Sequence, residues 1–309
     1  MNKKGRPLHG WIALDKPLEM TSTQALGAVK RLLKPKKAGH AGTLDPLATG
    51  ILPVALGDAT KLVNFAQEAI KVYDFTIQWG ERRETDDAEG EVIATSDHRP
   101  KIEEIAPALE AFIGEIEQIP PKYSAIKING QRAYDLARDG MDVEIKSRIV
   151  YIERLNILEA TTDTLRLKCV CGKGTYVRAL ARDIAHALGT EGYVSALRRT
   201  QVGAFTEENA ISLDDLENFD HNTSFETLLQ PLEMALDDIP VLSLTQEEAA
   251  RLKNGNVLTF VARPDFQRLL EAGIDTENGD QAAAFFQGKL IALVGVTGPR
   301  IQPERVFNT

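Results

Sequence analysis

Apolar residues recur at helical spacing in two segments of the chain. Residues 175–190 carry an apolar stripe with a helical repeat and reach Gly189, a residue typical of the position after a helix. Residues 21–33 repeat this spacing, with Thr21 or Ser22 placed to cap the helix N terminus. The sequence therefore predicts two amphipathic helices that each turn one face towards a core.

Alternating patterns predict strands around these helices. Tyr73, Phe75 and Ile77 alternate with polar residues, which is typical of a strand covered on one side. Two alternating runs within residues 149–174 are separated by polar positions and predict a strand-turn-strand unit. Further strands are predicted in the segments GWIALDK, ILPVAL and ALRRTQVGAF.

Polar and turn-rich segments separate these elements. Residues 81–100 predict an exposed loop or hairpin, and residues 101–140 a helix, irregular chain through Pro120 and Pro121, and a further short helix. Residues 207–238 are acidic and predict helices with connections. The mixture of strands and helices without strict alternation favours the α+β class.

The character of the chain changes at about residue 239. Residues 242–255 predict a small helix, and residues 282–296 form two apolar runs joined by Gln-Gly-Lys, which indicates a hairpin. We therefore expect two domains, a larger one at 1–238 and a small β-rich one at 239–309.

Composition limits the protein class. The 309 residues are 43% hydrophobic, enough for a sizeable core and for about two domains of roughly 100–200 residues. No run approaches the ~20 apolar residues of a membrane span, and the basic start of the chain lacks the apolar stretch of a signal peptide. We expect a cytoplasmic protein with no membrane partner.

The net charge of −9 is unevenly distributed. Residues 1–61 contain ten Lys and Arg against four acids, and residues 166–200 seven against two, whereas residues 207–250 contain twelve acids and no Lys or Arg. Phosphate binding depends on a local basic surface, so this pattern permits an RNA or DNA partner. Solvated charge on an acidic protein explains the pattern as well.

Few residues have the spacing of a metal or redox site. Cys169 and Cys171 are spaced C-x-C, which is neither the zinc nor the C-x-x-C redox spacing, and both would pack on one face of a strand. His40 with Asp45 is too small a ligand set for a metal. We expect no metal.

A single carboxylate, Asp45, stands in the run GHAGTLDPLATG of residues 39–50, whose many small residues suggest that something approaches the backbone closely. Pro46 steers Asp45 towards an extended backbone, which helps to fix its side chain. Glycosidase chemistry would need a second acid nearby. Two interpretations remain from the residues alone, a nucleophilic carboxylate and a structural turn residue.

Four segments resemble the TruB family of pseudouridine synthases, and together they cover about residues 8–205. GHAGTLDPLATGILPVALGDATK resembles the family's catalytic-aspartate motif, and DKPLEMTS its N-terminal motif, with Glu19 and Met20 where a glycine is expected. IPPKYSAIKINGQRAYDLARDG and GKGTYVRALARDIAHALG resemble further signatures. The resemblance implies a pseudouridine synthase fold with a mixed, largely antiparallel sheet, followed by a PUA-like RNA-binding domain.

The resemblance also assigns roles. It makes Asp45 the nucleophile, Arg178 the cation that pairs with it and lowers its pKa, and Tyr73 the ring that stacks on the target base and assists deprotonation at C5. It implies further substrate or supporting contacts from His40, Tyr176, Leu197 and Lys16. The alternative explanations are a surface position for Arg178 and core packing for Tyr73 and Leu197, and packing is the strongest alternative for Leu197.

The activity that the resemblance implies is that of an isomerase. Uridine 55 of the tRNA TΨC loop would be flipped out, cleaved at its glycosidic bond and rejoined through C5, without a cofactor. Asp45 would either attack C1′ or abstract the 2′ proton. The substrate would be the T stem-loop, gripped by Lys30, Arg31, Lys34, Lys36 and Lys37, with the acidic segment 207–250 facing away.

We expect a monomer that needs no guide RNA. Two other functions fit parts of the sequence. An RNA-folding factor with a vestigial site would not need the Asp45, Tyr73 and Arg178 trio. The catalytic subunit of a guide-RNA-dependent synthase shares the same core, but such proteins are typically longer or carry basic tails.

Overall fold

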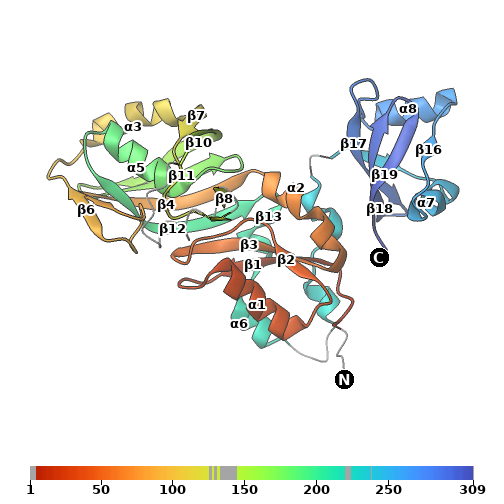
Figure 1. Ribbon diagram of the computed structural model, residues 1–309, viewed down its shortest axis with the longest axis horizontal. Helices are drawn as coiled ribbons and strands as arrows, with labels where there is room; N and C mark the ends of the chain where they lie inside the picture. Colours follow the sequence, from red (N-terminus) through yellow and green to blue (C-terminus); the bar gives the residue numbers. More distant parts are fainter. Residues whose placement is uncertain are drawn as a thin grey trace.

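The computed structural model describes residues 5–124, 127–128, 131–132, 145–219, 224–237 and 239–308. Two sheets organise this part of the chain (Figure 1). The large sheet follows the order β14-β1-β3-β12-β4-β11-β10-β7, with β2 beside β3 and β13 beside β12. Within it, β1–β14 and β3–β12 pair in parallel and the other pairs are antiparallel. The predicted α+β class and largely antiparallel core are confirmed.

The strands of the large sheet come from most of the first two thirds of the chain. They are β1 (Gly10–Lys16), β2 (Ala38–His40), β3 (Ala48–Leu56), β4 (Lys71–Trp79), β7 (Gly114–Gln118), β10 (Arg148–Ala160), β11 (Thr164–Cys171), β12 (Gly192–Val202), β13 (Phe205–Thr206) and β14 (Ala210–Ile211). Two short hairpins pair β5 (Glu81–Arg83) with β6 (Val92–Thr95) and β8 (Lys127–Ile128) with β9 (Gln131–Arg132).

Helices flank this sheet. The α-helices are α1 (Ser22–Leu33), α2 (Val63–Glu68), α3 (Ile102–Leu109), α5 (Val177–Ala187) and α6 (Leu213–Glu217), and the 3-10 helices are η1 (Gly57–Leu62), η2 (Glu110–Phe112), η3 (Glu207–Asn209), η4 (Phe225–Leu228) and η5 (Leu232–Ala235). α1 begins after Thr21, whose side chain accepts from the Gln24 N–H, so Thr21 is the cap and Ser22 the first helical residue. Both long helices confirm the predicted pattern.

The second sheet forms a separate, smaller unit. It has the order β15 (Val241–Ser243), β17 (Asp280–Phe286), β18 (Lys289–Thr297), β19 (Arg300–Val306) and β16 (Leu258–Thr259), with α7 (Gln246–Lys253) and α8 (Arg263–Glu271) against it. The predicted helix and hairpin are present, and α8 is an addition that the sequence analysis did not anticipate.

The small unit packs against η1, which directly follows β3. Phe307 is fully buried in a cluster that includes Leu62. The Lys61 Nζ donates to the carbonyl of Val306 at 2.7 Å, and Asp58 Oδ2 accepts from the Asn308 N–H at 2.9 Å. The end of β19 is therefore anchored to the last residues of the Asp45 motif.

Several local expectations need correction. Residues 81–100 do form a hairpin, but Asp86 and Asp87 within it are buried, so the predicted exposure is wrong there. The strand predicted at 196–205 begins at Gly192 and is interrupted after Val202. The further short helix predicted within residues 101–140 falls largely outside the described residues.

One expectation on local packing is met, and one residue adopts an unusual backbone conformation. Cys169 and Cys171 are both free and buried on β11, as predicted for strand packing. Glu19, which stands in the segment where the family has a glycine, has φ +60°, a conformation that favours glycine. Among the described residues, no helix is both long and apolar enough to span a bilayer.

Candidate active site

Asp45 lies in the loop between β2 and β3, at the edge of a pocket of about 280 Å³. The other pocket residues come from the same loop, from α2, β4, β10 and β12, and from α5 and the segment that leads into it, so elements far apart in the sequence converge on Asp45. Five of the seven predicted site residues line this pocket, namely Asp45, Tyr73, Tyr176, Arg178 and Leu197. Lys16 and His40 lie outside its lining.

The backbone around Asp45 is fixed by side chains from the first helix and strand. The Ser22 hydroxyl donates to the Leu44 carbonyl at 3.1 Å and accepts from the Leu44 N–H at 2.8 Å. The Asp45 carbonyl accepts from the Ala48 N–H at 3.1 Å, which closes a turn over Pro46. This clamp by a buried serine was missed by the sequence analysis, which considered Ser22 only as a helix cap.

Lys16 acts on the same loop from the other side. Its fully buried Nζ donates to the carbonyls of Pro17 and Met20 at 2.8 and 2.6 Å and lies 3.5 Å from the Pro46 carbonyl. Burial lowers its pKa to about 8, although Asp45 opposes the fall. Lys16 therefore holds the turn that carries Asp45, and it does not face the pocket.

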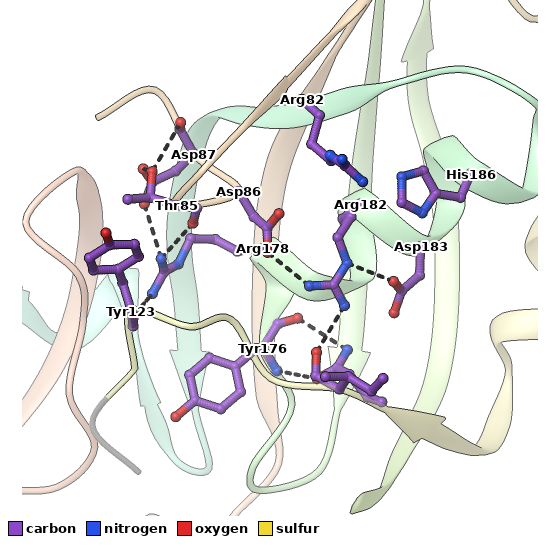
Figure 2. A network of polar contacts seen from close by, with 12 residues as sticks. Arg82, Thr85, Asp86, Asp87, Tyr123, Tyr176, Arg178, Arg182, Asp183 and His186 are labelled. Atoms are coloured by element: carbon purple, nitrogen blue, oxygen red, sulfur yellow. Dashed lines mark hydrogen bonds and ion pairs between the residues drawn. The ribbon is translucent and has the colours of Figure 1, made fainter. Parts of the chain in front are cut away.

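Arg178 joins Asp45 to the β5–β6 hairpin. Its Nε lies 2.9 Å from Asp45 Oδ2, and its Nη1 lies 3.4 Å from Asp87 Oδ2. Nη1 also donates to the Thr85 carbonyl at 2.7 Å, and Nη2 to the Tyr123 carbonyl at 2.9 Å, as Figure 2 shows. The guanidinium is only 5% exposed, so it is a buried, fully oriented partner of the carboxylate.

The pKa of Asp45 lies above its ordinary value of 3.8. Burial is the main cause and Asp87 adds to it, while Arg178 and Lys16 oppose the rise. The lowering by Arg178 is present as expected, but desolvation outweighs it. A poorly solvated carboxylate held by one guanidinium is suited to act as a nucleophile or a base.

A second arginine continues the network one turn further along α5. Arg182 Nη1 lies 2.9 Å from Asp86 Oδ2, and its Nε lies 2.9 Å from Asp183 Oδ1 (Figure 2). The sequence resemblance pairs Arg178 with Asp45 and assigns no role to Arg182. The adjacent pair Asp86-Asp87 was the available signal, since two arginines four residues apart need two acids.

The walls of the pocket come from β4 and β12. Leu197 on β12 pairs with Phe75 of β4 on one side and Ala48 of β3 on the other, so it stands beside the Asp45 loop. Tyr73 is 9% exposed, and burial raises the pKa of its hydroxyl, with Arg199 opposing the rise. The Tyr73 side chain is therefore a neutral phenol at physiological pH.

Tyr176 lies at the N-terminal end of α5 and is fixed through its backbone. Gln118 Oε1 accepts from the Tyr176 N–H at 2.8 Å, and Gln118 Nε2 donates to the Tyr176 carbonyl at 3.2 Å (Figure 2). The guanidinium of Arg148 stacks on the Tyr176 ring with its carbon 4.7 Å from the ring centroid. These contacts hold the ring against the pocket.

His40 ends β2, close to the pocket in sequence but outside its lining. Its Nδ1 is buried and has no hydrogen-bond partner among the described residues. Burial lowers the pKa of its ring, with Arg199 contributing, so the imidazole is neutral at physiological pH. Its predicted role in the vacated position of the RNA loop stays a prediction.

The pocket contains three cations that the sequence analysis did not select, Lys71, Arg148 and Arg199. Arg199 also explains part of the small-residue run around Asp45. A Cβ on Gly50 would stand 2.2 Å from the Arg199 carbonyl oxygen, and Gly50 has φ +99°. What approaches the backbone there is therefore strand β12. Among the described residues, no group of three or more His, Cys, Asp or Glu could hold a metal.

The chain is similar to known proteins over almost its whole length. Residues 30–177 match the model of the TruB family pseudouridylate synthase N-terminal domain, and residues 178–237 that of the tRNA pseudouridylate synthase B C-terminal domain. The chain is 50% identical over 308 residues to tRNA pseudouridine synthase B of Caulobacter sp. (strain K31), covering 99% of this chain and 98% of the relative. It is 46% identical to the protein of that name from Rhodospirillum rubrum, with coverage of 99% and 98%.

Solved structures share the fold over almost the whole length. A chain in the crystal structure of a Cbf5-Nop10-Gar1 complex has a TM-score of 0.74 at 26% identity and covers 97% of this chain and 85% of that one. A chain in the structure of an H/ACA RNP bound to a substrate RNA containing 2′-deoxyuridine has a TM-score of 0.73 at 25% identity, with coverage of 100% and 92%.

Proposed function

Because the chain belongs to the TruB family of pseudouridylate synthases, we propose that it converts uridine 55 in the TΨC loop of tRNA to pseudouridine at the Asp45 pocket. The observation that carries this proposal is the ion pair between Asp45 and the buried guanidinium of Arg178, with Tyr73 and Leu197 lining the same cavity. A structural turn residue would need neither a buried guanidinium nor a pocket in front of it.

The target base must leave its stack to reach this pocket. In the proposed complex the flipped uracil lies between the Tyr73 ring and Leu197, and its ribose faces Asp45. Asp45 then either attacks C1′ or removes the 2′ proton, and the C1′–N1 bond breaks. The uracil turns and its C5 bonds to C1′, while Asp45 leaves C1′ or returns the proton to C2′. The C5 proton is then lost and N1 gains one. The net reaction is an isomerisation that consumes no water and no second substrate.

Arg178 and Lys16 support this chemistry without contacting the base. The two donated hydrogen bonds and the Asp87 contact fix the Arg178 guanidinium, which in turn orients the Asp45 carboxylate. Lys16 holds the Pro46 turn through backbone carbonyls. Both are positioning residues, because a small displacement of a reacting group costs much of the rate.

The RNA backbone would be held by exposed lysines between α1 and β2. Lys34, Lys36 and Lys37 are exposed and lead directly into the strand that ends at His40. Arg31 already lies 4.0 Å from Glu217 of α6, so the acidic segment reaches the flank of α1. The grip on phosphates is therefore assigned mainly to the three lysines.

We infer the arrangement of the whole protein from the same features. Residues 1–238 form the catalytic domain and residues 239–309 a PUA-like RNA-binding domain, a division supported by the separate core of the second sheet. The protein acts on tRNA in the cytoplasm as a monomer, without a guide RNA. Turnover of a bare T-arm minihelix by the purified chain tests this independence.

The Asp45→Asn variant tests the catalytic role. We expect it to fold and to bind tRNA with the affinity of the unchanged chain, but to release no tritium from tRNA labelled at C5 of uridine. Asp74→Asn is the matched control, because Asp74 lies on β4 beside Arg166 and Lys168, outside the pocket lining. Normal tritium release by Asp45→Asn would refute the proposal, and annealing assays on the same variant would separate any RNA-folding activity.

A further inference from the structure

The pocket carries more positive charge than its carboxylate can balance. Arg178 is neutralised by Asp45 and Asp87. Lys71, Arg148 and Arg199 also line the cavity, and none of them forms an ion pair with a carboxylate among the described residues. Two of these cations, Lys71 and Arg199, are buried at 7% and 2% exposure.

The Arg199 guanidinium is held by neutral groups only. Its Nε donates to the Ile51 carbonyl at 2.8 Å, and its Nη2 donates to the Gly42 carbonyl at 3.1 Å. The register of β12 against β4 sets Arg199 opposite Tyr73. The guanidinium is therefore anchored rigidly beside the ring that is proposed to stack on the base.

Lys71 is anchored in a similar way on the neighbouring strand. It lies two residues before Tyr73 on the same face of β4, and its Nζ donates to the Gln67 carbonyl and, at 2.5 Å, to the Ala69 carbonyl. The two acids three residues away along the chain pair with other cations: Glu68 lies 2.5 Å from the exposed Lys173, and Asp74 lies near Arg166 and Lys168. Two of the three Nζ protons are therefore used by backbone groups.

Burying a charge without an opposite charge costs several kcal/mol, so such charges are rare unless a ligand supplies the balance. A floor of two fixed cations beside the base position is suited to a negative charge that arises there. Resting on the proposed function, we propose that Arg199 and Lys71 stabilise the negative charge that develops on the detached uracil. Asp45 would act on the sugar side of the breaking C1′–N1 bond, and the two cations would act on the uracil side.

The charge follows from the bond that breaks. When C1′–N1 cleaves, its electron pair passes to the uracil ring, where O2 and O4 share the negative charge. Asp45 meanwhile bonds to C1′ or takes the 2′ proton, so the sugar carries no free cation. When C5 attacks C1′, Asp45 leaves C1′ with its electron pair or returns the proton to C2′. The C5 proton then leaves and N1 is protonated. The cations stabilise the intermediate and the transition states on either side of it.

Lys71→Met and Arg199→Met test this assignment in single-turnover reactions with saturating enzyme. We expect each variant to slow product formation about 10²-fold while the Kd for tRNA stays within twofold, because the charge exists only after binding. The charge-conserving variants Lys71→Arg and Arg199→Lys should recover most of the rate. Thermal denaturation checks the fold, and Lys71→Met remains informative if Arg199→Met does not fold.

Matched control variants are available on the same strands. Arg198 is the neighbour of Arg199 on β12 but is paired with Asp15 and Glu207, and Lys168 lies on β11 near Asp74. Arg198→Met and Lys168→Met should change the single-turnover rate by less than about threefold. An equal loss in these controls would overturn the assignment, because it would reflect removal of any nearby cation.

A change of leaving group distinguishes charge stabilisation from structural support. Fluorine at C5 makes uracil more acidic, so a tRNA with 5-fluorouridine at the target position needs less help from the cations. The rate at which this nucleoside is consumed, measured after nuclease digestion, should fall less in Lys71→Met and Arg199→Met than the rate with uridine. An equal fall with both substrates would overturn the proposal and indicate a structural role.

The rate at high pH gives an independent readout. Burial lowers the pKa of Lys71 to about 8. Arg199 of β12 and Lys173 lower this pKa further, whereas Cys171 of β11 and Glu68 of α2 raise it. The charge of Lys71 is present below that pH and lost above it, so the rate should decline above pH 8 in the unchanged chain. Lys71→Arg should reduce this decline, and the part that remains should come from Lys16, whose pKa burial also lowers to about 8.

The proposed function and this inference fail in different ways. Absence of pseudouridine formation by the unchanged chain would contradict the function itself. If the function holds but Lys71→Met and Arg199→Met raise the Kd for tRNA and leave the single-turnover rate unchanged, the two cations bind a phosphate of the substrate, and the inference is wrong.

Discussion

Removing the guanidinium of Arg178 should lower the Tm of the catalytic unit. In Arg178→Met, Asp87 stays 7% exposed and loses the cation 3.4 Å away, and the carbonyls of Thr85 and Tyr123 lose their donors. Removing one partner of a buried ion pair costs about 3–5 kcal/mol. At about 2–4 °C per kcal/mol for a unit of this size, Tm should fall by about 6–20 °C.

The double variant Asp87→Asn/Arg178→Met isolates the electrostatic part of this loss. Because it removes the stranded carboxylate charge, it should recover part of the stability, so that the two substitutions are not additive. Circular dichroism during heating and guanidinium titration measure both quantities. Arg166→Met is the control, since Arg166 is 51% exposed and lies 3.6 Å from Asp74, a surface pair with a contribution of at most about 1 kcal/mol. An Arg178→Met protein with unchanged Tm would refute the reasoning.

Three further predictions concern the Asp45 loop. Gly50→Ala should destabilise the protein by at least about 1–3 kcal/mol, because φ is +99° and the new Cβ would meet the Arg199 carbonyl. The midpoint of unfolding in guanidinium chloride measures this loss, and an unchanged midpoint contradicts it. Only ionised Asp45 reacts, and burial raises its pKa, so activity is lost as the pH falls through that raised value. The acid limb of the kcat/KM profile should therefore lie above pH 3.8, and a limb below pH 3.8 contradicts this. Lys16→Met should lower the single-turnover rate by up to about 10²-fold with tRNA affinity unchanged, because the Pro46 turn loses its anchor, whereas reduced affinity at full rate would indicate a phosphate contact.

The sequence predicted the elements of the site well because their signals are local. The helix that carries Arg178 has its own apolar stripe and a glycine stop, and the strand that carries Tyr73 alternates strictly in burial. Both patterns depend only on neighbours along the chain. Asp45 was selected because it is the one acid in a run of small residues, and the resemblance then supplied its partner.

The site residues that the sequence did not predict depend on tertiary contacts. Asp87 belongs to a polar hairpin whose sequence is typical of an exposed turn, and it is buried only because α5 presents Arg178 to it. Lys71 and Arg199 look like ordinary strand residues until β4 and β12 pair and turn them towards one cavity. The balance of the Asp45 pKa likewise depends on burial, which no local pattern reveals.

Two smaller discrepancies have simple physical reasons. α8 was missed because residues 239–309 were interpreted mainly from the hairpin pattern, although Pro264 in its first turn is a typical helix start. Glu19 adopts the left-handed conformation despite its side chain, and its N–H donates to the Pro46 carbonyl at 2.9 Å. The glycine expected in that segment is therefore replaced at the cost of local strain.

The central claim is that this chain alone isomerises one uridine of tRNA at the Asp45 pocket. The most direct measurement is chemical mapping of pseudouridine in an unmodified tRNA transcript, and in its T-arm minihelix, after incubation with the purified chain and no other protein or RNA. We predict complete conversion at position 55 in both substrates and none with Asp45→Asn. Conversion at another position, dependence on added RNA, or conversion by Asp45→Asn would contradict the account.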